Sequence, residues 1–195
     1  MDVGEERAAQ ARNYALKLLD KITLKYHNKD HTLDVYNRVE WLCASENIDG
    51  KEKELLSIGA LYHDTGFIRQ YKNNEPIGAE IAANALAEFN YSQEDIEIVK
   101  NIILATALPQ KPKTKLEEII CDADLGVFGR DDFFALNDAL RQELNLDDKL
   151  VWYKGQLKFL EDHTYFTNTA KRELGPIKKK HIEEMQAKIK ELENG

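Results

Sequence analysis

Residues 55–66 read LLSIGALYHDTG, and this stretch decides how the rest of the chain is interpreted. An apolar, helix-like run from Leu55 to Tyr62 ends directly at an imidazole and a carboxylate, His63 and Asp64. Burying both groups together is costly unless a charge or a hydrogen-bond partner compensates. A divalent cation is such a partner, and a mixed imidazole and carboxylate set suits Zn, Fe, Mn or Ni better than Ca or Mg alone. The pair therefore raises the hypothesis of a metal site whose other ligands lie elsewhere in the chain.

Length and charge narrow the class of protein. The chain has 195 residues, which is enough for one large domain with its own core. Its net charge of −8 argues against a nucleic-acid polymer as a partner, since such binding needs a basic face. The N-terminal segment lacks an apolar signal core, and no apolar run reaches the roughly 20 residues that span a bilayer. We therefore expect a cytoplasmic protein with no membrane partner. Cys43 and Cys121 fall in apolar stretches, which predicts buried side chains.

Helical periodicity dominates the sequence, and no convincing period-two strand interrupts it. Loops are expected over residues 65–76 and 108–115, because both stretches combine proline with other residues that favour turns or polar loops. Helices are expected over 5–25, from an Asp30 N-cap to about Asn47, from Asp49 to the His-Asp pair, from Pro76, from Ser92, from near Leu116, over 132–144, over 147–169 and over 176–193. This pattern predicts an all-α protein, organised as a single-domain helical bundle over residues 1–195.

Two further stretches contain unusual polar residues. Residues 26–35 read YHNKDHTLDV, and His27 and His31 share one helix face if the helix extends back to His27. Residues 119–126 read IICDADLG, with two acids in an otherwise apolar segment. One interpretation is a helix N-cap at Asp122 with Asp124 in the first turn, and the other is a metal ligand. The remaining histidines, His163 and His181, fall on charge-rich helices and are expected to be exposed.

Together these stretches supply two imidazoles and two carboxylates. The candidate ligands are His31, His63, Asp64 and one acid near 122–124. Such a set is able to bind one divalent metal and still leave positions open for water and substrate, which distinguishes a catalytic site from a closed structural one. A metal in this setting lowers the pKa of bound water and polarises a phosphoryl oxygen.

The order His, then His-Asp, then Asp across an all-α chain resembles the HD-domain metal-dependent phosphohydrolase superfamily. The resemblance covers the range 24–130, an HD metal-site core, and leaves residues 131–195 as a helical C-terminal extension. It implies that His31 is the first metal ligand and that His63 and Asp64 form the doublet of the family. The last ligand of the family lies in an Ala-Asp-x-Leu-like context, which Asp124 fits best, with Asp122 as a neighbour able to substitute.

The opening residues Tyr26-His27-Asn28-x-x-His31 are also similar to the first motif of cyclic-nucleotide phosphodiesterases. That resemblance implies that His27 donates a proton to the leaving oxygen, and a histidine with its ordinary pKa suits this role. The alternative is a histidine that caps a helix start. Those enzymes hold two metals with further ligands after the doublet, but here residues 65–68 read TGFI and no histidine lies between 64 and 162. We therefore expect one divalent ion, which is Mn, Fe, Ni, Zn, Co or Mg.

Residues outside the ligand set complete the predicted site. Glu75 either orients the attacking water or lies in a first helical turn for the helix dipole. Arg69, Lys72 and Arg130 are the candidates for binding a small phosphorylated substrate, although each alone is more typical of a solvated surface charge. The oligomeric state is left open, with a homodimer as one option. Several aromatic side chains between 131 and 175 either stack on a base or belong to the core: Trp152, Tyr153, Phe159, Tyr165 and Phe166.

The leading hypothesis is an HD-type hydrolase that cleaves a phosphomonoester or phosphodiester bond in a small substrate, with nucleotides among the candidates. A second hypothesis is a non-catalytic helical binding or regulatory module with a vestigial metal site. A di-iron oxygenase of the same fold ranks lower, because such sites need extra histidines between the doublet and the final acid.

Overall fold

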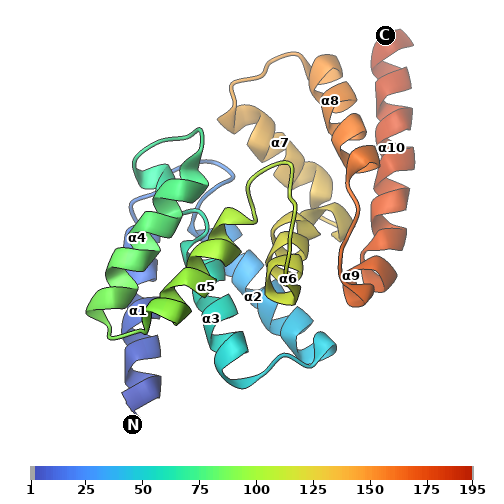
Figure 1. The fold of residues 1–195 in the computed structure, drawn as a ribbon. Coiled ribbons are helices and arrows are strands. Elements are labelled where there is room, and N and C mark those ends of the chain that lie inside the picture. The colour runs from blue at the N-terminus through green and yellow to red at the C-terminus, as the bar shows by residue number, and fades with distance from the viewer. Residues whose placement is uncertain (1–2, 195) are drawn as a thin grey trace. The chain divides into compact units, whose positions relative to one another are not determined.

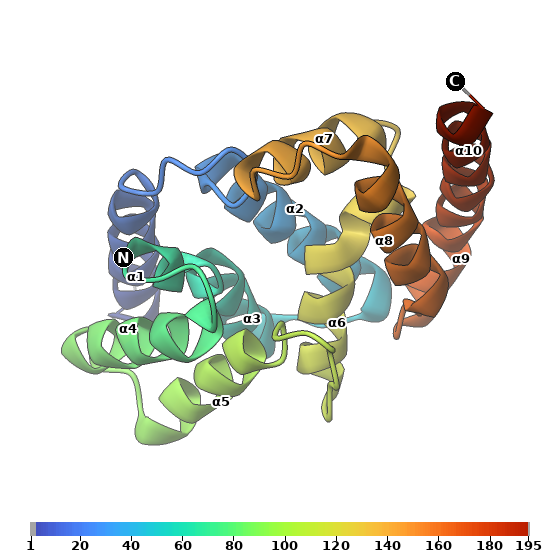
Figure 2. The same ribbon diagram turned by 90° about the horizontal axis from the view of Figure 1, so that it is seen from above.

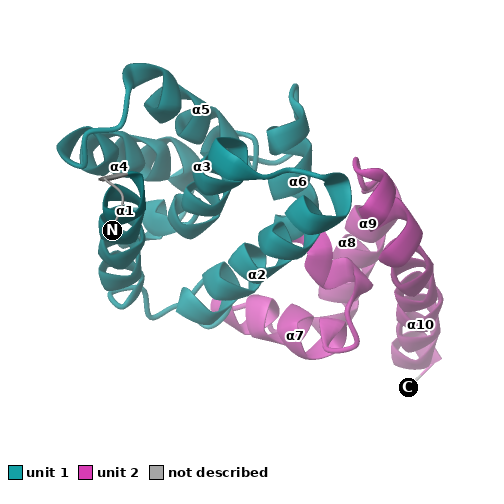
Figure 3. Ribbon diagram, turned by 90° about the horizontal axis from the view of Figure 1, so that it is seen from below, with its two compact units in different colours: residues 1–124 teal, residues 125–195 magenta. Residues whose placement is uncertain are grey.

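The structure, a computed structural model, describes residues 3–194, and every regular element in that range is a helix (Figure 1). The all-α prediction is therefore confirmed for this range. The chain divides into two compact units, residues 1–124 and 125–195, which Figure 3 shows in teal and magenta and which we describe separately. The predicted boundary at residue 130 stays a prediction. Among the described helices, none combines the length and apolar character needed to cross a membrane.

Within residues 3–124, the first unit contains six α-helices and one 3-10 helix: α1 (Val3–Leu19), α2 (Lys29–Glu46), α3 (Gly50–Tyr62), η1 (Thr65–Ile68), α4 (Asn74–Glu88), α5 (Gln93–Leu104) and α6 (Lys115–Asp124). Its core is an apolar cluster contributed by helices α1, α3, α4 and α5 and by the turn before α5, and α3, α4 and α5 lie side by side in Figure 2. The Tyr62 hydroxyl donates a hydrogen bond to the Ala11 carbonyl at 2.9 Å and so ties α3 to α1. These contacts hold the C-terminal end of α3, where the His-Asp doublet begins. Cys43 and Cys121 are buried, as predicted.

Helix α2 begins later than the spacing of the histidines suggests. Its N-cap is Asn28, whose side-chain oxygen accepts hydrogen bonds from the backbone N–H groups of Asp30 and His31. The predicted cap at Asp30 is therefore wrong, because Asn28 already satisfies these first donors. His27 precedes the cap and lies outside the helix, so the condition for a common helix face of His27 and His31 is not met.

The segment after α1 and the segment after the doublet also differ from expectation. Helix α1 ends at Leu19 rather than near residue 25, and Ile22 is buried from the non-helical connection, so its apolar side chain reflects core packing. In the expected loop, residues after Asp64 form η1, which crosses the start of α4 closely. A Cβ at Gly66 would lie 1.9 Å from the Asn74 carbonyl oxygen, so only glycine allows this approach.

The second unit consists of η2 (Leu125–Gly129), α7 (Phe133–Glu143), α8 (Lys149–Asp162), α9 (Asn168–Glu173) and α10 (Gly175–Asn194). The helix expected over 147–169 is interrupted, because Thr167 caps a new helix by accepting a hydrogen bond from the Ala170 N–H. The Lys178 ammonium donates to the carbonyls of Leu160 and His163 at the C-terminal end of α8, which satisfies acceptors that the helix end leaves open.

The two histidines of the second unit are not exposed, so the prediction for them is wrong. His181 is buried, with Nδ1 2.9 Å from the Phe128 carbonyl oxygen and its ring stacked on Phe133. His163 is half-buried and packs edge-on against the rings of Phe128 and Tyr165. Burial disfavours its charged form and lowers the pKa of His163 to about 4.

Of the five aromatic residues considered for base stacking, Trp152 and Tyr165 are buried. The indole N–H of Trp152 donates a hydrogen bond to the Asn137 side-chain oxygen at 2.7 Å, inside the second unit. These two side chains therefore fit the core interpretation rather than base stacking.

Candidate metal centre

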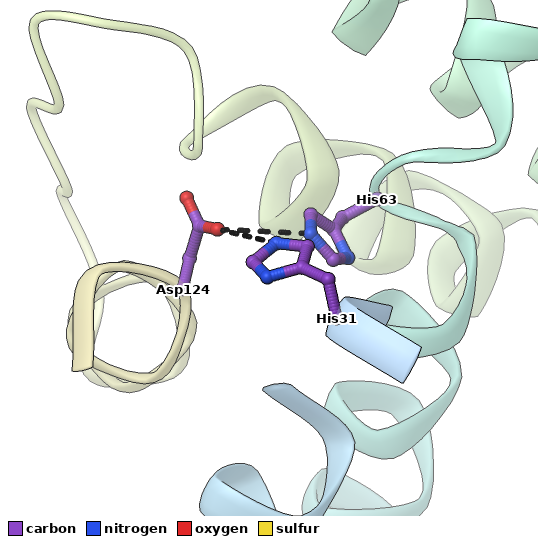
Figure 4. Close-up of side chains that lie close together, drawn as sticks. All are labelled: His31, His63 and Asp124. Atoms are coloured by element: carbon purple, nitrogen blue, oxygen red, sulfur yellow. Dashed lines mark ion pairs between the residues drawn. The ribbon is translucent and has the colours of Figure 1, made fainter. Parts of the chain in front are cut away.

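Three helix ends of the first unit bring the predicted ligands together. His31 lies in the first turn of α2, His63 and Asp64 follow the last turn of α3, and Asp124 is the last residue of α6. One ligand atom each from His31, His63 and Asp124 lies within 4.8 Å of the others. Figure 4 shows both imidazoles turned toward the Asp124 carboxylate, with dashed lines from one oxygen to a nitrogen of each ring.

Asp64 joins this group from the doublet. Its Oδ2 lies 3.4 Å from His31 Nε2 and 3.2 Å from His63 Nε2. Asp124 Oδ1 lies 3.5 Å and 3.7 Å from the same two nitrogens. Four residues separated by up to 93 positions in the sequence, from His31 to Asp124, thus direct two nitrogens and two oxygens at a common point. This arrangement is what the ordered His, His-Asp, Asp pattern predicts.

Several of these atoms are left without a hydrogen bond. His31 Nε2, His63 Nε2 and Asp64 Oδ2 are buried and have no hydrogen-bond partner in the structure. Buried polar atoms in native proteins nearly always have a partner, and an unplaced water or ion is one explanation for an exception. Imidazole nitrogens and carboxylate oxygens are ligands for a transition-metal dication. The residues present therefore fit a divalent metal.

The orientation of His63 suits metal binding. Its Nδ1 lies 2.7 Å from the Ala60 carbonyl oxygen, which is an acceptor only, so Nδ1 carries the proton and Nε2 faces the carboxylates. Burial opposes a charged imidazole here, but the adjacent carboxylates of Asp64 and Asp124 outweigh it and raise the pKa of His63 to about 9. Burial also opposes a charged Asp64, but His63 and the neighbouring imidazoles hold the pKa of that carboxyl well below its usual range.

Asp124, and not Asp122, belongs to this group. Asp122 is fully buried in α6, and because both acids lie at the end of that helix, the interpretation of Asp122 as an N-cap is wrong. Asp124 Oδ2 accepts a hydrogen bond from the Gln110 side-chain amide at 3.2 Å. One residue earlier, the Ala123 carbonyl accepts a hydrogen bond from Arg38 at 2.9 Å. The carboxylate is therefore held through both its side chain and its backbone.

His27 lies beside the centre but outside the group of closely spaced ligand atoms. Its ring stacks on Phe67, with centroids 4.6 Å apart and planes at 30°, and its centroid is 5.7 Å from that of His31. Tyr71 approaches the His27 ring edge-on. The positive charge of His27 is one of the causes that lower the pKa of Asp64, so the two side chains are electrostatically coupled. Its role as a proton donor stays a prediction.

Sequence reasoning missed two residues at the centre, Tyr26 and Gln110. The Tyr26 ring centroid lies 4.9 Å from that of His31, and burial together with the Asp124 charge raises the pKa of this phenol, which keeps it protonated. Its position next to His27 in the motif was an available signal. Gln110 belongs to the proline-containing loop before α6, and nothing in the sequence indicates that this loop returns to the ligands.

The remaining predicted residues lie on other segments. Glu75 lies in the first turn of α4. One turn later, Gly78 packs against the doublet so closely that a Cβ there would lie 3.0 Å from the His63 carbonyl oxygen. Arg69 is exposed and pairs with Glu80 at 3.2 Å. Lys72 is exposed on the connection between η1 and α4. Arg130 belongs to the second unit and pairs there with Asp132. Their roles stay predictions.

Comparison with known proteins agrees with this geometry. Residues 29–125 match the HD domain, a range that contains all four of the proposed metal ligands. An uncharacterized protein of Clostridium beijerinckii is 36% identical over 81 residues, which are 40% of this chain and 51% of that protein. The chain thus matches about half the length of that relative. No solved structure shows significant similarity to the chain.

Proposed function

Because this chain contains an HD domain over residues 29–125, we propose that it is a metal-dependent phosphohydrolase that cleaves a phosphomonoester or phosphodiester bond in a small substrate. The observation that carries the proposal is the convergence of three buried ligand atoms that lack any hydrogen-bond partner, on His31, His63 and Asp64. When bound, a divalent ion acts as a Lewis acid toward a phosphoryl oxygen and lowers the pKa of water, which is the chemistry that this hydrolysis needs.

The proposed metal ligands are His31, His63, Asp64 and Asp124. The expected metal is one ion of Mn, Fe, Ni, Zn, Co or Mg. Two imidazoles and two carboxylates fill only part of its coordination shell, so coordination positions remain for water and substrate. The hydrogen bond from His63 Nδ1 to the Ala60 carbonyl supports this assignment, since metal-ligating histidines usually direct their second nitrogen to such an acceptor.

His27 is the proposed proton donor to the leaving oxygen. Its ring is half-buried, lies next to that of His31 and is held against the face of Phe67. An imidazole is suited to this task because its ordinary pKa lies close to neutral pH. Glu75 is the proposed residue that orients the attacking water, from a helix start that packs against the backbone of the doublet.

Positive charge for an anionic substrate has to be concentrated locally, because the chain carries a net charge of −8. Arg69 and Lys72 follow the doublet closely in the sequence, and both are exposed. We assign the binding of the substrate phosphate to these two residues, with the ion pair between Arg69 and Glu80 opening when substrate binds.

Metal analysis of the purified protein, combined with a screen of nucleotides, sugar phosphates and phosphodiesters, tests the proposal. We expect close to one divalent ion per chain and turnover of at least one compound, and both should be lost in Asp64→Ala. The exposed Asp162→Ala provides a matched control that should retain both. Retention of metal and hydrolysis by Asp64→Ala would rule out this site. Metal binding without turnover of any compound would favour the non-catalytic module, and two irons per chain would favour an oxygenase.

A further inference from the structure

The loop between α5 and α6 places the side chain of Gln110 on the carboxylate of Asp124. Gln110 Nε2 donates to Asp124 Oδ2 at 3.2 Å, whereas Asp124 Oδ1 is the oxygen that lies 3.5 Å and 3.7 Å from the two imidazole nitrogens. We infer that Gln110 is a positioning residue, which binds one oxygen of Asp124 and thereby presents the other to the metal. This inference rests on the metal site of the proposed function and adds a residue to it.

The orientation of the Gln110 amide follows from the chemistry of its partner. An ionised carboxylate only accepts hydrogen bonds, so the amide nitrogen and not the amide oxygen has to face Asp124. The other end of the same amide, Oε1, is buried and has no hydrogen-bond partner. Leaving a buried carbonyl oxygen unpaired costs free energy. In this orientation the amide nitrogen is paired with Asp124, and the amide oxygen at the other end of the group has no hydrogen-bond partner.

The loop that carries Gln110 is fixed to the helix that carries Asp124. At its start, the thiol of Cys121 in α6 donates to the Ala105 carbonyl oxygen at 3.2 Å. At its end, the Lys113 backbone N–H donates to the Glu117 carboxylate, also in α6, at 2.6 Å. Both ends of the loop that carries Gln110 are thus tied to α6, the helix that ends at Asp124.

Gln110 and Arg38 act on different degrees of freedom of Asp124. Arg38 donates from Nη1 to the Ala123 carbonyl, and its Nη2 is held by Asp34, so this contact fixes the backbone next to Asp124. Rotation of the carboxylate about its last side-chain bond is still possible, and the terminal torsion of aspartate is broad. The hydrogen bond from Gln110 restrains that rotation. It thus sets the orientation in which the free oxygen faces the two imidazoles.

Two substitutions separate this role from simple packing. Loss of a hydrogen-bonding partner of a metal ligand usually weakens metal affinity about 10–100-fold, and we expect a loss of this size for Gln110→Ala. Gln110→Met retains roughly the size of the side chain but lacks the amide donor, so its loss should match that of Gln110→Ala. A packing role predicts instead that Gln110→Met binds metal as the wild type does, because methionine fills the same space and alanine does not.

The test is a titration of the metal-free full chain with Co²⁺, followed by calorimetry and by the visible absorption of the bound ion, which reports its coordination. The control is Lys111→Ala, an exposed neighbour on the same loop, which should bind as the wild type does. We expect affinity to fall about equally in Gln110→Ala and Gln110→Met, with an altered absorption spectrum in both. Melting temperatures of the metal-free variants separate loss of ligand geometry from loss of folding.

Two results would contradict the inference. Wild-type affinity in Gln110→Met beside a loss in Gln110→Ala would show that Gln110 acts through its volume. Wild-type affinity and an unchanged spectrum in both variants would show that Asp124 needs no second partner. Either result leaves the proposed function standing, whereas a wild-type chain that binds no Co²⁺ would overturn both.

Discussion

Replacing His31 by glutamine tests whether metal binding contributes to the stability of this fold. The His31 side chain is 8% exposed, and its Nε2 lies 3.4 Å from Asp64 and 3.5 Å from Asp124. Glutamine retains similar length and helix propensity in the first turn of α2 but lacks the imidazole nitrogen. The replacement therefore removes one of the four proposed ligands.

The size of the effect follows from mass action. A ligand at 100 times its Kd stabilises the folded state by about 2.7 kcal/mol, and each kcal/mol shifts the melting temperature of a chain of this length by about 2–4 °C. Saturating metal should therefore raise the melting temperature of the wild type by roughly 5–11 °C. If the lost ligand weakens binding about 100-fold, the same metal concentration stabilises His31→Gln by only about 0.4 kcal/mol, a shift below about 2 °C.

Differential scanning calorimetry of the metal-free and metal-loaded proteins measures both shifts at one fixed metal concentration. Glu183→Gln, an exposed replacement of the same isosteric kind in the second unit, should show the full wild-type shift. A shift in His31→Gln as large as that of the wild type would refute the assignment of His31 as a ligand. No shift in the wild type would refute the metal centre itself.

Two further predictions concern other histidines. His27→Gln should slow the hydrolysis of alkyl phosphates about 10²–10⁴-fold. It should leave the hydrolysis of 4-nitrophenyl phosphate unchanged, because that leaving group needs no proton. Equal losses in kcat for both substrates would exclude proton donation by His27. For His163, the folded-state pKa of about 4 lies below the ordinary 6.5, so on acidification the unfolded chain takes up a proton first and stability falls between these pH values. Urea unfolding between pH 7 and pH 4 should show that the free energy of unfolding declines less steeply for His163→Gln than for the wild type. An equally steep decline would contradict the lowered pKa of His163.

The ligands were predictable because local sequence signals mark each of them. The doublet follows an apolar run, and Asp124 lies in an apolar segment where an acid is unexpected. Gln110 carries no such signal, since a loop residue has no periodicity and its contact with Asp124 depends on the path of the loop. That path is set by hydrogen bonds from Cys121 and to Glu117, which the sequence does not reveal.

Exposure of the second-unit histidines was misjudged for a related reason. His181 lies on a helix rich in lysine and glutamate, a composition that predicts a solvated face. Its burial depends on two residues about 50 positions earlier in the chain. The Phe128 carbonyl oxygen lies 2.9 Å from its Nδ1, and its ring stacks on Phe133. A single histidine surrounded by charges gives no sign of such a tertiary contact, because charged neighbours on a helix point in other directions.

The ends of the helices explain why this centre favours a cation beyond its choice of ligands. His63 and Asp64 follow the C-terminal end of α3, and Asp124 ends α6, so two helices direct the negative ends of their dipoles toward the ligands. Helix α2 contributes a positive N-terminal end next to His31, and η1 begins directly after Asp64. The two carboxylates add negative charge at the same place, which a divalent ion would offset. In the proposed reaction, we therefore expect metal binding to favour the binding of a phosphorylated substrate.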